Sequence, residues 1–75
     1  MTEGFNCRCI WVDQQNKYIF IGTKGGTILV YNIDNYELIY INIKAHKEGI
    51  IEITKLGEKT IITWSYDKTI KIWNY

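Results

Sequence analysis

Short runs of β-branched and aromatic residues, separated by polar or glycine-containing turns, follow one another along the whole chain. Such runs are typical of strands, because stiff or flat side chains fit a pleated sheet. The expected strands are residues 7–12, 18–23, 27–33, 37–43, 50–54, 59–65 and 69–73. In the fourth run Ile39, Ile41 and Ile43 recur at every second position, which is the period of a strand and not of a helix.

The connections between these runs are short. Most of them have two to five residues, which is enough to join antiparallel neighbours but too few for a helix that crosses a sheet. The pattern therefore predicts an all-β fold built as an antiparallel meander. A meander can form a sandwich, a barrel or the blade of a propeller, and internal repetition decides among these.

The chain repeats itself with a period of 42 residues. Shifted by this length, the sequence matches itself without gaps at several strand and turn positions. The matched pairs are Lys17 with Lys59, Ile19 with Ile61, Thr23 with Ser65, Thr27-Ile28 with Thr69-Ile70, and Tyr31-Asn32 with Trp73-Asn74. A repeat of about 40–45 residues with three or four strands is typical of a propeller blade.

The second repeat contains a specific series of residues. It begins with Ala45-His46, continues with Ile50 and Ile53, and ends with Thr63-Trp64-Ser65-Tyr66-Asp67-Lys68-Thr69-Ile70-Lys71-Ile72-Trp73-Asn74. In this series the chain resembles the WD-repeat family of β-propellers, whose pattern is a Gly-His pair, an alternating strand, a Ser-x-Asp turn and a Trp-Asp ending. His46 precedes Trp73 by 27 residues, which lies within the spacing of that family.

The resemblance implies a fragment of a β-propeller made of antiparallel four-stranded blades. The first blade would span residues 7–43 and is degenerate, because Gly25 stands in place of the aspartate and Tyr31 in place of the tryptophan. The second blade would span residues 44–75 and lack its outer strand.

The resemblance also implies a buried hydrogen-bonded set in the second blade. Its members would be His46, Ser65, Asp67 and Trp73. A buried aspartate costs free energy unless donors reach it. An imidazole N–H and a hydroxyl supply such donors, and the hydroxyl can in turn accept from the indole N–H. The set is expected to tie the loop before the second blade to its inner turn and outer strand.

Composition and charge narrow the function classes. The chain is 47% hydrophobic and 15% aromatic, as folded domains are, and a net charge of +1 gives no general basic field for nucleic acid. One histidine, His46, and two cysteines, Cys7 and Cys9, do not supply the four ligands of a zinc site. No apolar run approaches the roughly 18 residues of a membrane span. We expect a cytoplasmic protein with no metal, cofactor or membrane segment.

Catalysis is not expected, although His46, Ser65 and Asp67 supply a base, a nucleophile and an acid. A catalytic triad needs an exposed serine beside an oxyanion hole, with histidine between the other two, whereas Ser65 enters a tight turn two residues before Asp67. Residues 22–27 lack the Gly-Lys-Ser/Thr ending and the following helix of a phosphate-binding loop. The scattered acidic residues are interpreted as solvated charges; they are Asp13, Asp34, Glu37, Glu48, Glu52 and Glu58.

Strand direction places alternate turns at opposite ends of the sheets. One end gathers a set of residues that are candidates for binding a partner: Lys24, Lys44, Lys47, Tyr66 and Lys68. Because the resembled family most often holds peptides and partner proteins at this end, we expect a protein or peptide partner, acidic or phosphorylated. The alternative is that these lysines only keep the chain soluble.

The preferred function is a non-catalytic scaffold segment for protein–protein interaction. The alternative is a regulatory propeller portion of a larger signalling or lipid-modifying enzyme, while near-neutral charge disfavours a propeller that binds nucleic acid. Propellers close with about four to eight blades, so two blades leave apolar faces uncovered. We favour a piece of a larger protein over a short chain that self-associates, and the isolated chain should be oligomeric or poorly soluble.

Overall fold

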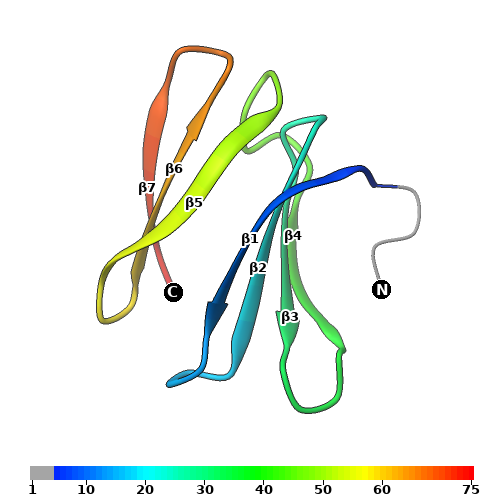
Figure 1. The fold of residues 1–75 in the computed structure, drawn as a ribbon, viewed down its shortest axis with the longest axis vertical. Helices are drawn as coiled ribbons and strands as arrows, with labels where there is room; N and C mark the ends of the chain where they lie inside the picture. Colours follow the sequence, from blue (N-terminus) through cyan, green and yellow to red (C-terminus); the bar gives the residue numbers. More distant parts are fainter. Residues whose placement is uncertain (1–4) are drawn as a thin grey trace.

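The computed structural model describes residues 5–75, and within this range it contains seven strands and no helix (Figure 1). The strands are β1 (Cys7–Asp13), β2 (Tyr18–Thr23), β3 (Ile28–Asn32), β4 (Leu38–Asn42), β5 (Ile50–Gly57), β6 (Thr60–Ser65) and β7 (Ile70–Asn74). Each strand pairs antiparallel with its neighbour in the same sheet. The predicted all-β antiparallel fold is confirmed, and its architecture is consistent with a propeller fragment.

The strands form two sheets built on one plan. The first sheet has the order β1-β2-β3-β4 and the second has the order β5-β6-β7. The 42-residue period reappears in the register, because Ile19 lies opposite Tyr31 in the first sheet and Ile61 lies opposite Trp73 in the second. Within residues 5–75 the second sheet contains no counterpart of β4.

The main core lies between the two sheets, where β5 packs beside β1 and β2. Figure 1 shows the sheets diverging from this contact, toward β4 on one side and β7 on the other. The buried side chains of the core are Phe20, Ile28, Val30, Ala45, Ile50, Ile53 and Ile61. Trp73 and Tyr75 pack against them with part of their surface exposed. This core fixes the position of one sheet relative to the other.

A second apolar cluster lies on the far face of the first sheet, which is the face turned away from the second sheet. It contains the buried side chains of Ile19, Ile21, Leu29 and Tyr31. Alternation explains the separation, since successive residues of a strand point to opposite faces. Phe5 packs against this cluster.

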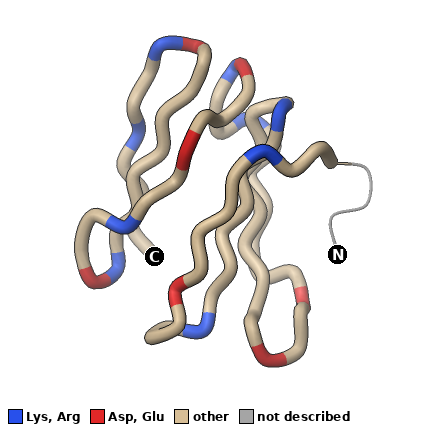
Figure 2. Tube along the Cα trace, viewed as in Figure 1, with Lys and Arg blue, Asp and Glu red and all other residues tan. Residues whose placement is uncertain are grey.

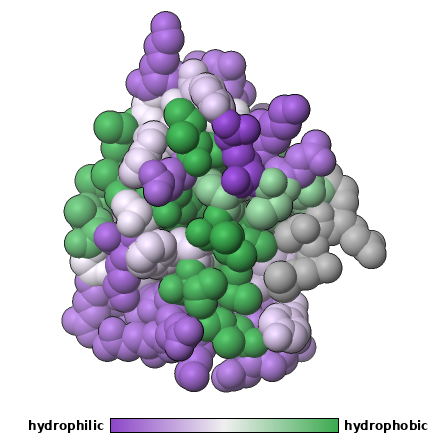
Figure 3. Space-filling view, viewed as in Figure 1, coloured by the Kyte–Doolittle hydropathy of each residue, from purple (hydrophilic) through white to green (hydrophobic). Residues whose placement is uncertain are grey.

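The outer face of the second sheet, the face turned away from the first sheet, is apolar as well. It is formed by Ile62, Trp64, Ile70 and Ile72, of which Ile70 and Ile72 expose 68% and 60% of their surface. Figure 3 shows apolar side chains at the surface along the left flank, over β6 and β7. Contiguous exposed apolar area is a feature of interaction surfaces.

Most strand boundaries lie within one residue of the prediction, and only the end of the fifth strand differs by more. The sequence pattern ends the fifth strand at residue 54, whereas β5 continues to Gly57 and the following turn is correspondingly shorter. Register shifts between β5 and β6 lie at Ile50/Glu52 and at Lys55/Gly57. Such irregularities insert an extra residue and interrupt the alternation, so the pattern alone ends the strand too early.

Candidate functional site

Three connections meet at one end of the molecule, at the top of Figure 1: the β2–β3 turn, the β4–β5 loop and the β6–β7 turn. Main-chain hydrogen bonds join them. The N–H of His46 in the β4–β5 loop donates to the carbonyl of Gly26 at 3.0 Å, and the N–H of Tyr66 in the β6–β7 turn donates to the carbonyl of Gly49 at 3.1 Å. The three connections therefore form one continuous surface.

The close approach of the β4–β5 loop to the β2–β3 turn depends on glycine at position 26. Gly26 has a φ of 90°, a left-handed value that residues with a side chain rarely adopt. A Cβ atom there would lie 2.8 Å from the carbonyl oxygen of Glu48 and closer still to that of His46. Of the two adjacent glycines in this turn, Gly25 and Gly26, only Gly26 has a positive φ.

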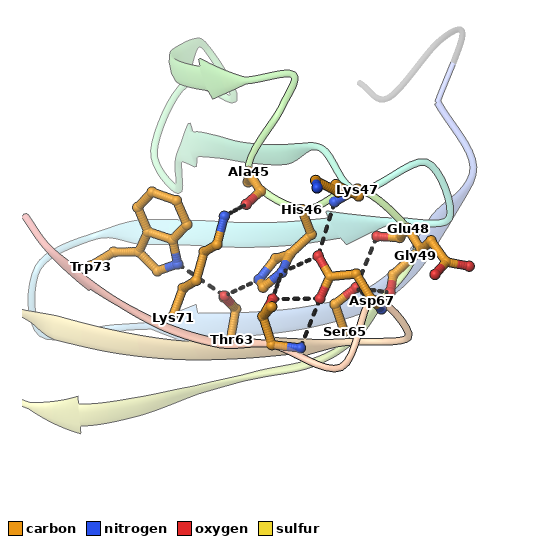
Figure 4. Close-up of polar contacts among 11 residues, drawn as sticks. Ala45, His46, Lys47, Glu48, Gly49, Thr63, Ser65, Asp67, Lys71 and Trp73 are labelled. Carbon is orange, nitrogen blue, oxygen red and sulfur yellow. Dashed lines mark hydrogen bonds and ion pairs between the residues drawn. The ribbon is translucent and has the colours of Figure 1, made fainter.

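A polar network fastens the β4–β5 loop to the second sheet (Figure 4). The imidazole Nδ1 of His46 lies 3.1 Å from Oδ2 of Asp67, and its Nε2 lies 2.7 Å from Oγ1 of Thr63. The indole Nε1 of Trp73 donates to the same Thr63 hydroxyl at 2.9 Å. Each of these groups is satisfied when His46 carries its proton on Nδ1, because Nε2 then accepts from the Thr63 hydroxyl.

The hydroxyl that connects His46 to Trp73 belongs to Thr63, and the expectation that Ser65 supplies it is wrong. Trp73 lies opposite Ile61 across the β6–β7 pair. Thr63 is two positions from Ile61 on the same face, whereas Ser65 is four positions away, or about 13 Å along the strand. Ser65 is therefore out of reach of the indole.

Ser65 has a different part in the same region. Its hydroxyl lies 2.8 Å from the carbonyl oxygen of Gly49 and 3.0 Å from that of Glu48, and it accepts a hydrogen bond from the N–H of Asp67 at 3.1 Å. Ser65 thus closes the β6–β7 turn and fastens it to the β4–β5 loop. Both hydroxyls brace the loop, but they hold different partners.

Asp67 is the acceptor at the centre of the network. The side chain and the main-chain N–H of Thr69 donate to its Oδ1, and the N–H of Lys47 donates to its Oδ2 at 2.9 Å. These hydrogen bonds, with that of the Thr69 hydroxyl the largest cause, hold the pKa of the Asp67 carboxyl well below its usual range. Asp67 is therefore a firmly ionised anchor for the β4–β5 loop.

The residues predicted to contact a partner all lie exposed at this end, on the three connections just described (Figure 2); they are Lys24, Lys44, Lys47, Tyr66 and Lys68. A further cation joins them from the start of β1. The guanidinium of Arg8 lies 4.6 Å from the centre of the Tyr66 ring and donates a hydrogen bond to the Tyr66 hydroxyl. These six residues are called the basic end below. The pattern missed Arg8 because 58 positions separate it from Tyr66.

At the opposite end a buried carboxylate ties the two sheets together. Asp13 is 4% exposed, so its interpretation as a solvated charge is wrong. It accepts hydrogen bonds from the hydroxyl of Tyr75 at 2.6 Å, from the side-chain amide of Asn16 at 2.9 Å and from the ammonium of Lys55 at 3.3 Å. The only local signal was the short turn from Asp13 to Asn16, because Lys55 and Tyr75 are distant in the sequence.

Burial and hydrogen bonding act in opposite directions on this carboxylate. Burial raises the pKa of Asp13, but the hydrogen bonds from Tyr75, Asn16 and Lys55 outweigh that effect and hold the pKa well below its usual range. Burial, together with the bond to Asp13, raises the pKa of Tyr75 to about 12. The cluster is therefore fully formed at neutral pH.

The recess and the cysteines of the described residues offer weaker evidence for a functional site than the basic end does. An open apolar recess of about 270 Å³ lies between the sheets on the side of β4 and β7, lined in part by Tyr40, Trp73 and Tyr75. Cys7 and Cys9 are free thiols. Within residues 5–75 no group of three or more His, Cys, Asp and Glu side chains is placed to hold a metal ion. None of the described segments is a helix long and apolar enough to cross a membrane.

Comparison with known proteins gives relatives but no family assignment. No protein-family model and no solved structure matches the chain. Human dynein axonemal assembly factor 10 is 31% identical in an alignment 67 positions long that covers 80% of this chain and 19% of that protein. Rat apoptotic protease-activating factor 1 is 28% identical over 67 residues, which are 89% of this chain and 5% of that protein.

The chain therefore spans about a fifth of the length of the first relative and about a twentieth of the second. Both relatives contain WD repeats. The chain is thus similar to WD-repeat proteins, in agreement with the resemblance carried by its second repeat.

Proposed function

We propose that the chain is a non-catalytic protein-binding segment of a WD-repeat propeller. Residues 7–43 form one blade in this proposal and residues 44–75 form most of the next. The matching registers of the two sheets support this division, as does the similarity to WD-repeat proteins. The segment acts in the cytoplasm as part of a scaffold.

The observation that carries the proposal is the basic end. Its lysines and Tyr66 are exposed on connections whose main chain is fixed by the His46–Asp67 contact and by the bonds to Gly26 and Gly49. Arg8 and four lysines stand at this end against the carboxylates of Glu48 and Asp67, and the hydrogen bonds of Asp67 fix its position without removing its charge. A fixed surface with an excess of cations fits an acidic or phosphorylated peptide.

The hydrogen bonds of His46 and Ser65 support a structural role for these residues and not a catalytic one. The Ser65 hydroxyl faces main-chain carbonyls of the β4–β5 loop, and the Nε2 of His46 is paired with Thr63. In a nucleophilic site the imidazole would instead stand beside the serine hydroxyl. We therefore assign both residues to the support of the binding surface.

Charge reversal tests the binding surface. The probe is a fluorescein-labelled peptide of glutamate and phosphoserine, followed by fluorescence anisotropy. Replacing Lys47→Glu together with Lys68→Glu should weaken binding about tenfold or more, because two favourable charge contacts become repulsive. Binding to the unchanged chain should also weaken with added salt.

A matched control lies at the opposite end. Lys17→Glu with Lys59→Glu makes the same change of net charge, and each pair contains one exposed lysine with positive φ, 69° at Lys68 and 64° at Lys17. The control pair should leave the affinity within about twofold, since exposed charges beyond a Debye length are screened. Equal losses from both pairs, or no binding by the unchanged chain, would contradict the proposed surface.

A further inference from the structure

The 42-residue repeat fixes which face of one sheet corresponds to which face of the other. The inner face of the first sheet carries Phe20 and Val30, which are buried against the second sheet. Their counterparts one period later are Ile62 and Ile72, on the outer face of the second sheet. The outer face of the second sheet, which is exposed, therefore corresponds to the inner face of the first sheet, which the second sheet covers.

The converse correspondence holds for the other two faces. Ile61 and Trp73 of the second sheet pack against the first sheet in the main core. Their counterparts one period earlier are Ile19 and Tyr31, which belong to the far face of the first sheet. The far face of the first sheet thus corresponds to the inner face of the second sheet, and the outer face of the second sheet corresponds to the inner face of the first sheet. The two inner faces already pack against each other in the main core, although several residue types differ between the repeats.

From this correspondence we infer that a second copy of this chain docks head to tail, with the far face of its first sheet on the outer face of the second sheet of the first copy. The new junction continues the arrangement of the internal one. Because the two surfaces differ, the contact is heterologous, and repeating it leads to a ring when the rotation closes. Propellers have about four to eight blades, so a closed ring would contain about two to four copies.

Phe5 occupies part of the docking position. It packs against the far face of the first sheet and so takes the place of a neighbour in the single chain. Beside it on the same face, Ile10 and Val12 of β1 expose 56% and 45% of their surface. Docking of a second copy therefore displaces Phe5 and covers these two side chains.

Complementary variants separate a head-to-tail contact from other kinds of association. Ile70→Glu with Ile72→Glu places charges on the outer face of the second sheet, and Ile10→Glu with Val12→Glu places them on the far face of the first sheet. All four side chains are exposed, so far-ultraviolet circular dichroism should show unchanged strand content. In analytical ultracentrifugation each double variant alone should be a monomer, while an equimolar mixture should form a one-to-one dimer through its single intact junction.

Three outcomes would overturn the inference. The first is an unchanged chain that remains monomeric up to about 1 mM, the limit of weak association. The second is a mixture of the two variants that stays monomeric. The third comes from the unchanged chain, in isotope-filtered nuclear magnetic resonance of labelled and unlabelled copies. In the internal junction β5 lies beside β1 and β2, so head-to-tail docking gives contacts between the methyl groups of Ile62 of one copy and Ile10 of another, whereas contacts of Ile62 with Ile62 alone would show a symmetric contact.

The displacement of Phe5 gives a further test, in which the direction of change in the midpoint concentration of assembly is measured. Phe5→Ala removes the side chain that competes with the second copy, so the concentration at the midpoint of assembly should fall about tenfold, in line with the burial of a large apolar side chain. A midpoint that rises would place Phe5 within the junction and would contradict docking on this face.

Discussion

The hydroxyl of Thr63 forms hydrogen bonds with two rings at once. It lies between Nε2 of His46 and Nε1 of Trp73, and its residue is 0% exposed. Without it both nitrogens lose a hydrogen-bond partner inside the protein, and a polar group left without a partner is costly where it is buried. The contribution of this residue therefore far exceeds that of an exposed threonine.

Replacing Thr63 by valine keeps the shape of the side chain and removes the hydroxyl. We expect Thr63→Val to lower the free energy of unfolding by about 1–3 kcal/mol, because it strands the indole N–H and one imidazole nitrogen. Urea unfolding at low protein concentration measures this. Thr60→Val is the control, since the Thr60 hydroxyl bonds Asn74 at an exposed site and its loss should cost at most about 0.5 kcal/mol. Equal effects of the two changes would contradict the assigned network.

Among the side chains of the network, the sequence predicted the contact of His46 with Asp67 but not that the hydroxyl of Thr63 connects His46 to Trp73. Thr63 and Ser65 lie on the same face of β6, so alternation does not distinguish them. The choice depends on which of them lies beside Trp73, and that is set by the register of β6 and β7. Asp13 was missed for a similar reason, because its donors Lys55 and Tyr75 come from the other sheet.

Among the elements, the β2–β3 turn controls how closely the β4–β5 loop approaches. Gly26 leaves room for the carbonyl groups of His46 and Glu48, and its own carbonyl accepts the N–H of His46. The preceding residue, Gly25, has only the Thr23 hydroxyl nearby, 4.0 Å from a Cβ placed there. Two adjacent glycines therefore differ sharply in what they tolerate.

An alanine at each of these positions tests the difference. Gly26→Ala should lower the free energy of unfolding by about 2–4 kcal/mol, because the side chain meets both an unfavourable φ and two carbonyl groups. Gly25→Ala should change it by no more than about 0.5 kcal/mol. Thermal and urea unfolding measure both. A tolerated alanine at position 26 would show that the loop can move away without loss.

The elements themselves were largely predictable, since the number, order and pairing of the strands follow from the period of two and the short connections. What the pattern could not place was the end of β5. There the shift between Lys55 and Gly57 breaks the alternation on which the prediction depends. The boundary is set by pairing with β6, which is a property of two strands together.

For the whole molecule, the Asp13 cluster joins the two sheets at the end opposite the basic end. Asp13 comes from β1, whereas Lys55 and Tyr75 belong to the second sheet or follow it. The main core supplies the apolar contact between the sheets, and this cluster adds directed bonds. The relative position of the sheets should therefore respond to the ionisation of Asp13 and Tyr75.

The sign of that response follows from the two pKa shifts. The pKa of Asp13 is lowered on folding, so its contribution to stability is present above about pH 4 and is lost as the pH falls below that value. The pKa of Tyr75 is raised to about 12, so its contribution is present below about pH 10 and is lost as the pH rises toward the higher value.

Asp13→Asn should therefore reduce the loss of stability in acid. Melting temperatures followed by circular dichroism between about pH 2 and pH 7 should fall less steeply for this variant than for the unchanged chain. Asp34→Asn at an exposed turn is the control and should leave the acid dependence nearly as it is. If both variants behave alike, Asp13 does not couple the sheets.

The shared register of Ile19 with Tyr31 and of Ile61 with Trp73 has a consequence for how such a chain can lengthen. When a gene segment that encodes one full period is duplicated, the added unit has one apolar face that packs on the preceding unit and another face on which the next unit can pack. No new surface has to evolve before the longer product can fold. Growth by whole periods is therefore the least disruptive change open to this architecture, whereas an insertion of an odd number of residues inside a strand would turn its apolar side chains toward the opposite face.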